Sequence, residues 1–177
     1  MSKAVLISIR PEWCQKIMAG RKTIEVRKTR PKMNPPFKCY IYRSVQGGVI
    51  GEFVCDHIFE RIVRVGANCE APKYCICDWN MDCTPLDTLL ADACLTKDEL
   101  EKYLDGGVGY GWHISNLKIY DTPKELIEFH TWKKCKSCNK SGYESTACIY
   151  DENCIIPAAI TKAPQSWCYV EEEIWND

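Results

Sequence analysis

The chain has 177 residues with 23 Lys and Arg, 24 Asp and Glu, and 13 Cys. This length suits one elaborated domain better than two full domains, and no apolar run approaches the roughly 20 residues that a membrane helix needs. The first residues lack the layout of a signal peptide, because their apolar run is short and no small-residue cleavage site follows it. We therefore expect a cytoplasmic protein.

Charge is distributed unevenly along the chain. Residues 10–43 carry ten Lys and Arg against two Glu, a local charge of +8, whereas the rest of the chain is net acidic. A basic N-terminal third on an acidic protein indicates an anionic ligand, with nucleic acid the leading candidate. A solvated basic face without a ligand explains the charge equally well.

The first predicted elements are a strand and a helix. A short apolar run at residues 4–9 predicts a buried strand. The helix after it should begin near Pro11, a residue tolerated in the first turn, and end at Gly20, which can adopt the left-handed conformation. The predicted apolar stripe of this helix consists of Trp13, Ile17 and Met18.

Strands follow in the next part of the chain. Residues 23–28 and 38–43 are predicted strands, and the loop at residues 30–36 between them holds three prolines, which cannot lie inside a sheet. The β-branched run at residues 49–65 predicts one bent strand or a pair of strands. Residues 66–84 are expected to be irregular.

Two helices and a strand are predicted after this segment. Thr84-Pro85 should open a helix that runs to about Ala93. Thr96 and Glu99 have the spacing of a capping box and should open a second helix. A strand is then predicted at residues 112–120.

The remaining elements complete the predicted fold. Residues 122–125 resemble a second capping box and should open a short helix, residues 133–163 show little periodicity, and residues 166–174 predict a closing strand. About six strands with several short helices, and no alternation of strand and helix, indicate an α+β, mainly β fold. We expect a small mixed or antiparallel β-barrel decorated with short helices.

The most informative motif lies in residues 19–28. If residues 23–28 form a strand, Thr23, Glu25 and Arg27 face one way, and Lys22 lies at the turn before them. Arg supplies a bidentate fork, Lys a mobile charge, and Glu an acceptor for exocyclic amines or a general base, so these residues can bind a phosphate or a nucleobase edge. The alternative is a Glu25–Arg27 ion pair on a solvated strand face.

Further ligand-binding candidates lie in the C-terminal half. Trp112 and Ser115 follow a glycine turn, and Trp112 either stacks on a base or belongs to the core. His113 should point to the opposite strand face from Trp112. Gln165, Ser166 and Trp167 are candidates for the far wall of a binding cleft.

The run Gly20-Arg21-Lys22-Thr23-Ile24-Glu25-Val26-Arg27 resembles the signature of the ASCH domain family of the PUA-like superfold, a helix followed by Gly-x-Lys-x-x-(Glu or Thr)-x-Arg. Residues 8–13, 49–53, 111–115 and 164–170 also fit this family, and the last two resemble a bacterial and phage-borne branch. The resemblance covers most of residues 1–130 and 160–174.

The resemblance implies an ASCH domain built from residues 1–130 and 160–177, interrupted by a Cys-rich insert at residues 131–159. It implies a PUA-like β-barrel with a cleft beside the signature, and a role in binding RNA or nucleoside-like ligands.

Some members of this family are enzymes. One branch hydrolyses the amide of acetylated cytidine with a Lys at the position of Lys22 and a nucleophilic Thr at the position of Glu25, and another branch is reported to cleave RNA. Here Glu25 replaces the Thr, and a carboxylate this close to Lys22 favours the charged amine over the neutral amine of a base. Lys22 and Glu25 are thus the candidates for catalysis, but the motif favours RNA or nucleotide binding. The alternatives are an RNA-processing or modified-nucleoside hydrolase and a protein-interaction module.

Thirteen cysteines without an export signal indicate metal ligation or buried thiols. Four of them have the spacing Cys135-x2-Cys138-x9-Cys148-x5-Cys154, and the first pair resembles a zinc knuckle. We predict a structural Zn²⁺ there, with free thiols or a disulfide as alternatives and His130 as a possible substitute ligand. Four thiolates leave no open position, so this ion would stabilise the insert and not catalyse.

The other cysteines fall into two groups. The first has poor spacing for a metal site and is expected to hold free thiols: Cys69, Cys75, Cys77 and Cys83. The second lies in periodic segments and is expected to fill the core: Cys14, Cys39, Cys55, Cys94 and Cys168.

Overall fold

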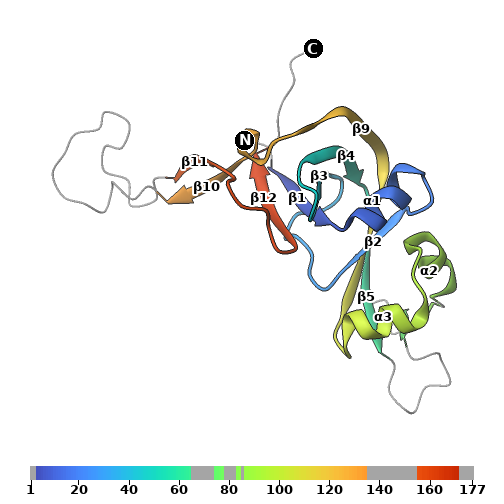
Figure 1. Cartoon of the computed structure of the whole chain (residues 1–177). Coiled ribbons are helices and arrows are strands. Elements are labelled where there is room, and N and C mark those ends of the chain that lie inside the picture. Colours follow the sequence, from blue (N-terminus) through green and yellow to red (C-terminus); the bar gives the residue numbers. More distant parts are fainter. Residues whose placement is uncertain (1–2, 65–73, 78–82, 85, 135–154, 172–177) are drawn as a thin grey trace, which may run out of the picture.

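The computed structural model describes residues 3–64, 74–77, 83–84, 86–134 and 155–171. Within these ranges the protein is mainly β with short helices, and most strands lie in two five-stranded sheets (Figure 1). This confirms the predicted fold class.

The first sheet has the strand order β12-β1-β3-β4-β9. β1 and β3 run parallel, and the other neighbours run antiparallel. The strands are β1 (Lys3–Ile9), β3 (Phe37–Arg43), β4 (Val49–Cys55), β9 (Ser115–Lys124) and β12 (Trp167–Glu171).

The second sheet is antiparallel, with the order β2-β8-β5-β6-β7. Its strands are β2 (Ile24–Arg27), β5 (Ile58–Arg64), β6 (Tyr74–Cys77), β7 (Cys83–Thr84) and β8 (Gly109–His113). A separate hairpin of β10 (His130–Lys134) and β11 (Ile155–Ala159) projects away from the two sheets (Figure 1).

Four helices complete the described elements: α1 (Pro11–Met18), α2 (Asp87–Ala93), α3 (Lys97–Leu104) and the 3-10 helix η1 (Leu126–Glu128). The predicted starts near Pro11 and Thr96 are confirmed, since Pro11 opens α1 and the Thr96–Glu99 capping box is formed. Gly20 follows α1 with φ +68°, the left-handed conformation that lets the chain turn into β2.

Apolar side chains form three clusters. The largest joins the first sheet, α1 and Trp112 of the second sheet. A second packs β2 against α2 and α3, and a third lies where β1 and β3 meet Phe129. β1 contributes Val5 and Ile7 to the first cluster and Ala4 and Leu6 to the third, so burial on both faces explains its continuous apolar run.

Several boundary predictions are wrong because strand ends depend on distant partners. The predicted strand at residues 112–120 is divided at Ile114 into β8 and β9, which belong to different sheets. The run at residues 49–65, for which one bent strand or a pair of strands was predicted, is a pair, β4 and β5, with one strand in each sheet. Where the chain passes from one sheet to the other, the apolar pattern of the sequence continues without a break, so the pattern does not mark the boundary between the two strands.

Other predicted elements differ at their ends. Residues 122–124 extend β9 instead of opening a helix, and Glu125 caps η1, with Glu125 N donating to Glu128 Oε1 at 2.6 Å. The segments expected to be irregular contain β6, β7, β11 and the last two residues of β10, short strands whose pairing has no strong local signal. In α1 the buried residues are Cys14 and Ile17, whereas Met18 is 50% exposed.

Candidate functional site

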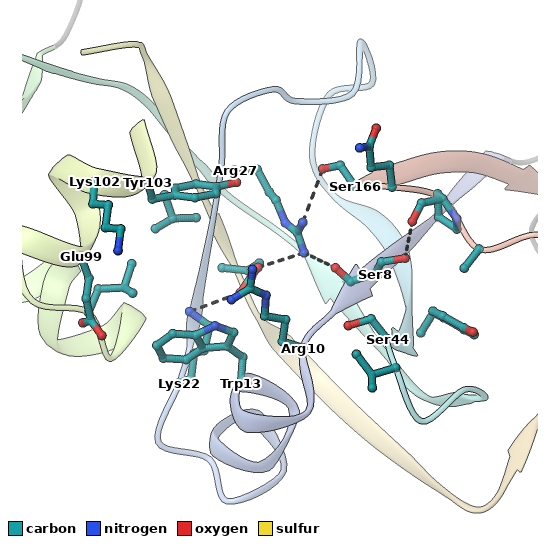
Figure 2. A pocket seen from close by; sticks show the side chains of 18 residues that line it. Ser8, Arg10, Trp13, Lys22, Arg27, Ser44, Glu99, Lys102, Tyr103 and Ser166 are labelled. Atoms are coloured by element: carbon teal, nitrogen blue, oxygen red, sulfur yellow. Dashed lines mark hydrogen bonds and ion pairs between the residues drawn. The ribbon is translucent and has the colours of Figure 1, made fainter. Parts of the chain in front are cut away.

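A cleft of about 790 Å³ opens where β2 and α1 face α3 (Figure 2). Its remaining walls come from the end of β1, the turn between β3 and β4, and residues 163–166 before β12. The cleft therefore brings together segments from both ends of the described chain.

The alternation of β2 directs charge into this cleft. Ile24 and Val26 pack against α2 and α3, so Glu25 and Arg27 point to the opposite face, as the sequence predicted. Within the described residues, the buried charged side chains are those of Lys22, Glu25 and Arg27, with exposed fractions of 3%, 7% and 8%.

Glu25 connects the two cations. Its Oε2 lies 3.2 Å from Lys22 Nζ, and its Oε1 lies 3.0 Å from Arg27 Nη2. The ion pair that we considered for a solvated strand face thus exists, but it is buried. Burial of ions costs free energy that their mutual attraction only partly offsets, and the set of two cations and one anion keeps a net charge of +1.

Lys22 is held by the fold on several sides. Its Nζ donates to the backbone oxygen of Ala93 at the end of α2 at 2.8 Å and lies 5.1 Å from the ring centre of Trp13. A cation at the C-terminal end of a helix is favourable for that helix. Lys22 therefore connects Glu25, which lines the cleft, to the end of α2 behind it.

Arg27 has donor capacity left over. Its Nη2 donates to Ser8 O at 2.6 Å, and its Nη1 donates to Ser166 Oγ at 3.4 Å, as the dashed lines in Figure 2 show. Its Nε is buried and has no hydrogen-bond partner among the described residues. A buried N–H without an acceptor costs about 1–3 kcal/mol, so this group favours a ligand that brings an acceptor.

The rim of the cleft contains residues that sequence reasoning missed. Trp13 was assigned to an apolar stripe but lines the cleft, where Lys16 Nζ lies 4.3 Å from its ring centre. Lys102 and Tyr103 of α3 lie on one side, and Ser44 lies on the other side, as does Ser166, which was predicted (Figure 2). An aromatic residue between Arg10 and Lys16 of the basic segment was a usable signal for Trp13, whereas Tyr103 carried none.

The structure brings five of the nine predicted ligand-binding residues into the cleft lining: Lys22, Glu25, Arg27, Gln165 and Ser166. The other four lie outside the lining: Thr23, Trp112, Ser115 and Trp167.

The structure places three of these four in other contacts. Trp112 is fully buried and packs on Phe37 and Trp167. Of the two predicted alternatives, base stacking or a place in the core, the structure therefore shows the core. Ser115 Oγ donates to Val54 O at 2.8 Å, and Trp167 Nε1 donates to Thr29 Oγ1 at 3.0 Å.

The predicted zinc ligands lie outside the described residues: Cys135, Cys138, Cys148 and Cys154. His130 is exposed at the start of β10. In the described ranges, no three His, Cys, Asp or Glu side chains gather as metal ligands do. The pairing of β10 with β11 brings the two ends of the Cys-rich segment together. The zinc site stays a prediction, which elemental analysis of the purified protein tests.

Comparison with known proteins gives a family match and structural matches. The sequence model of the ASCH domain matches residues 7–97, just over half of the chain. The crystal structure of ASCH from Zymomonas mobilis matches with a TM-score of 0.56 and 16% identity, over 96% of this chain and 88% of that one.

Two mutants of the Zymomonas mobilis protein match with the same TM-score and identity. One has a tyrosine replaced by phenylalanine and the other a serine replaced by alanine, and the matches cover 91% and 89% of those chains. At this identity the similarity shows the fold. No curated protein sequence matches the chain. None of the described helices is long and apolar enough to cross a membrane.

Proposed function

The chain belongs to the ASCH domain family, and on this premise we propose that it binds RNA or a nucleotide-like ligand in the cleft beside Lys22, Glu25 and Arg27. The family is associated with RNA binding. The basic segment at residues 10–43 supplies much of this wall of the cleft, which suits a polyanion.

One observation carries the proposal. The Nε–H of Arg27, a residue of the cleft wall, is buried and has no acceptor among the described residues. Because the neighbouring ion pairs keep a net positive charge, the acceptor best suited to this position carries negative charge or a strong dipole. A phosphate oxygen and a nucleobase carbonyl both meet this requirement.

The other cations of the cleft have a different role. Lys22 and Glu25 are buried and engaged with each other, so they hold Arg27 in place. Arg10 and Lys102 are exposed and line the same cleft, where they are available to phosphates of the ligand. Such exposed contacts supply affinity that falls as the salt concentration rises.

The arrangement supports binding more strongly than catalysis. Lys22 Nζ is engaged by the Glu25 carboxylate and by Ala93 O, so its amino group is already occupied by two partners within the fold. Glu25 accepts from both cations and is correspondingly restrained. Product formation from RNA or acetylated cytidine that is lost in Glu25→Gln would favour a hydrolase instead.

The test compares Arg27→Gln with Arg21→Gln. Both changes remove one positive charge, but Arg21 is exposed and lies outside the cleft lining. We expect Arg27→Gln to weaken binding of a short single-stranded RNA about 10- to 100-fold, the value of a charge-assisted hydrogen bond, and Arg21→Gln to change it far less. Fluorescence anisotropy measures the affinities.

A folding control belongs with this experiment. Thermal melting of both variants establishes that the protein remains folded, and Ser166→Ala tests the cleft without changing its charge. Equal RNA affinity of the Arg27→Gln, Ser166→Ala and unmodified proteins would contradict the proposed site.

A further inference from the structure

The turn between β3 and β4 holds a valine in an unfavourable conformation. Val45 has φ +71°, and Gln46 N donates to Ser44 O at 2.8 Å across it, which defines a γ-turn with positive φ. This turn is rare and strained, and a β-branched residue in the left-handed region is an outlier.

Neighbouring contacts impose this conformation. Ser44 N donates to Ile9 O at 2.8 Å, and Ser44 Oγ donates to the same oxygen at 3.1 Å. On the other side of the turn, Gly47 N donates to Arg43 O at 3.0 Å. The turn is therefore fixed to the end of β1, where Ser8 O accepts a hydrogen bond from Arg27 Nη2.

Packing of the Val45 side chain does not compensate for the strain. Val45 is 95% exposed, although its side chain lines the cleft. An isolated exposed apolar residue is ordinary on a protein surface. Here, however, neither burial of the Val45 side chain nor a favourable backbone conformation stabilises the folded protein. Asn or Gly would relieve the strain at this position.

The surroundings of Val45 indicate what covers it. The adjacent Ser44 lies across the cleft from Tyr103, which is itself 39% exposed (Figure 2). The exposed cations Arg10 and Lys102 line the same opening. Apolar and aromatic surface next to exposed cations is the combination that binds the bases and phosphates of single-stranded nucleic acid.

We propose that Val45 is a specificity-determining contact at the rim of the cleft, covering the face of a base next to the nucleotide held by Arg27. This inference rests on the proposed function. A ligand small enough to remain on the floor beside Arg27 leaves Val45 in water, whereas a strand that continues past the rim buries it. The site therefore selects an oligonucleotide over a free nucleotide.

The test uses Val45→Asn with Val108→Asn as its matched control. Val108 is 41% exposed and lies outside the cleft lining. The probes are a short single-stranded RNA and the corresponding nucleoside monophosphate, titrated at one salt concentration. We expect Val45→Asn to weaken RNA binding about fivefold, by loss of part of an apolar contact, and to leave binding of the monophosphate unchanged.

Stability separates a ligand contact from a merely structural turn. Because Asn tolerates the left-handed conformation, Val45→Asn should melt at or above the temperature of the unmodified protein while binding RNA more weakly. Val45→Gly, which also relieves the strain, should behave in the same way and serves as a second variant if Val45→Asn does not fold.

The outcomes distinguish this inference from the function on which it rests. RNA affinity unchanged in Val45→Asn and Val45→Gly overturns the role of Val45, and equal weakening toward both probes overturns the selection for length. If the unmodified protein binds neither probe, or if Arg27→Gln binds both as tightly, the proposed function itself fails.

Discussion

At the scale of single residues, Glu25 organises the charges of the cleft. It is the acceptor shared by Lys22 and Arg27, and its position two residues before Arg27 on β2 places both side chains on one face. A neutral residue there would leave two buried cations close together without a counter-charge, which is strongly unfavourable. Glu25 therefore has a structural role, the neutralisation of buried charge, that is independent of any reaction.

A hydrogen bond between His113 and Asp56 connects two strand ends outside the cleft. His113 Nδ1 and Asp56 Oδ1 are 2.6 Å apart, and His113 N donates to His57 O at 3.0 Å. The hydrogen bond from His113 lowers the pKa of Asp56 below its usual value of 3.8. The pair thus links the end of β4 to the end of β8.

His113→Ala should move the pKa of Asp56 back toward 3.8. A carboxyl group whose pKa is lowered by folding stabilises the protein above 3.8, and this contribution is lost as the pH falls through its folded pKa. The variant should therefore lose less stability on acidification than the unmodified protein. NMR titration of the Asp56 carboxyl group measures the shift, with His57→Ala as the neighbouring control; an unchanged titration in His113→Ala would contradict the assignment.

At the scale of elements, α3 depends on its N-terminal cap. Glu99 N donates to Thr96 Oγ1 at 3.2 Å, and Thr96 N donates to Glu99 Oε2 at 2.8 Å. These bonds satisfy donors that a helix start leaves free, and they lower the pKa of Glu99. The cap matters for the cleft because α3 carries Lys102 and Tyr103 to its rim.

Thr96→Ala should lower the free energy of unfolding by about 1 kcal/mol, the usual cost of losing such a cap. Urea denaturation measures the change, and Thr161→Ala, at an exposed position outside any helix or strand, is the control. Because folding lowers the pKa of Glu99, the contribution of the cap is lost as the pH falls below 4.5. Equal stability of the two variants at pH 7 would refute the role of the cap.

At the scale of the whole molecule, thiols are part of the core between the sheets. Cys14, Cys39 and Cys55 are free and buried in the largest apolar cluster. Burial raises the pKa of Cys14 and of Cys55 to about 12 and that of Cys39 well above its usual value. This confirms the core assignment for these three cysteines, whereas Cys94 and Cys168 are only half-buried.

The buried thiols should make the fold sensitive to alkali. Above pH 9 the unfolded chain loses their protons while the folded chain keeps them, so stability falls as the pH rises toward 12. Each such thiol contributes up to about 1.4 kcal/mol per pH unit. Urea denaturation at pH 8 and pH 10 should give a smaller loss for Cys39→Ala than for the unmodified protein or the half-buried control Cys94→Ala; identical losses in all three would exclude this cause.

The predictions from sequence succeeded where a few neighbouring residues decide the structure. The left-handed turn at Gly20, the cap at Thr96 and the facing of Glu25 and Arg27 each depend on residues within one turn or one strand. The division at Ile114 was missed because the strands on either side of it find partners in different sheets.

The sequence by itself determined the mainly β fold, the family signature and the direction in which β2 presents its charges, because hydrophobic period and turn chemistry are local. Only the tertiary structure decided that these charges are buried and what holds them. Lys22 donates to Ala93 O, 71 residues away, and Arg27 donates to Ser8 O and to Ser166 Oγ. The oxygens of Ala93 and Ser8 belong to the backbone, which carries no signal of residue type, so packing alone makes them the partners of Lys22 and Arg27.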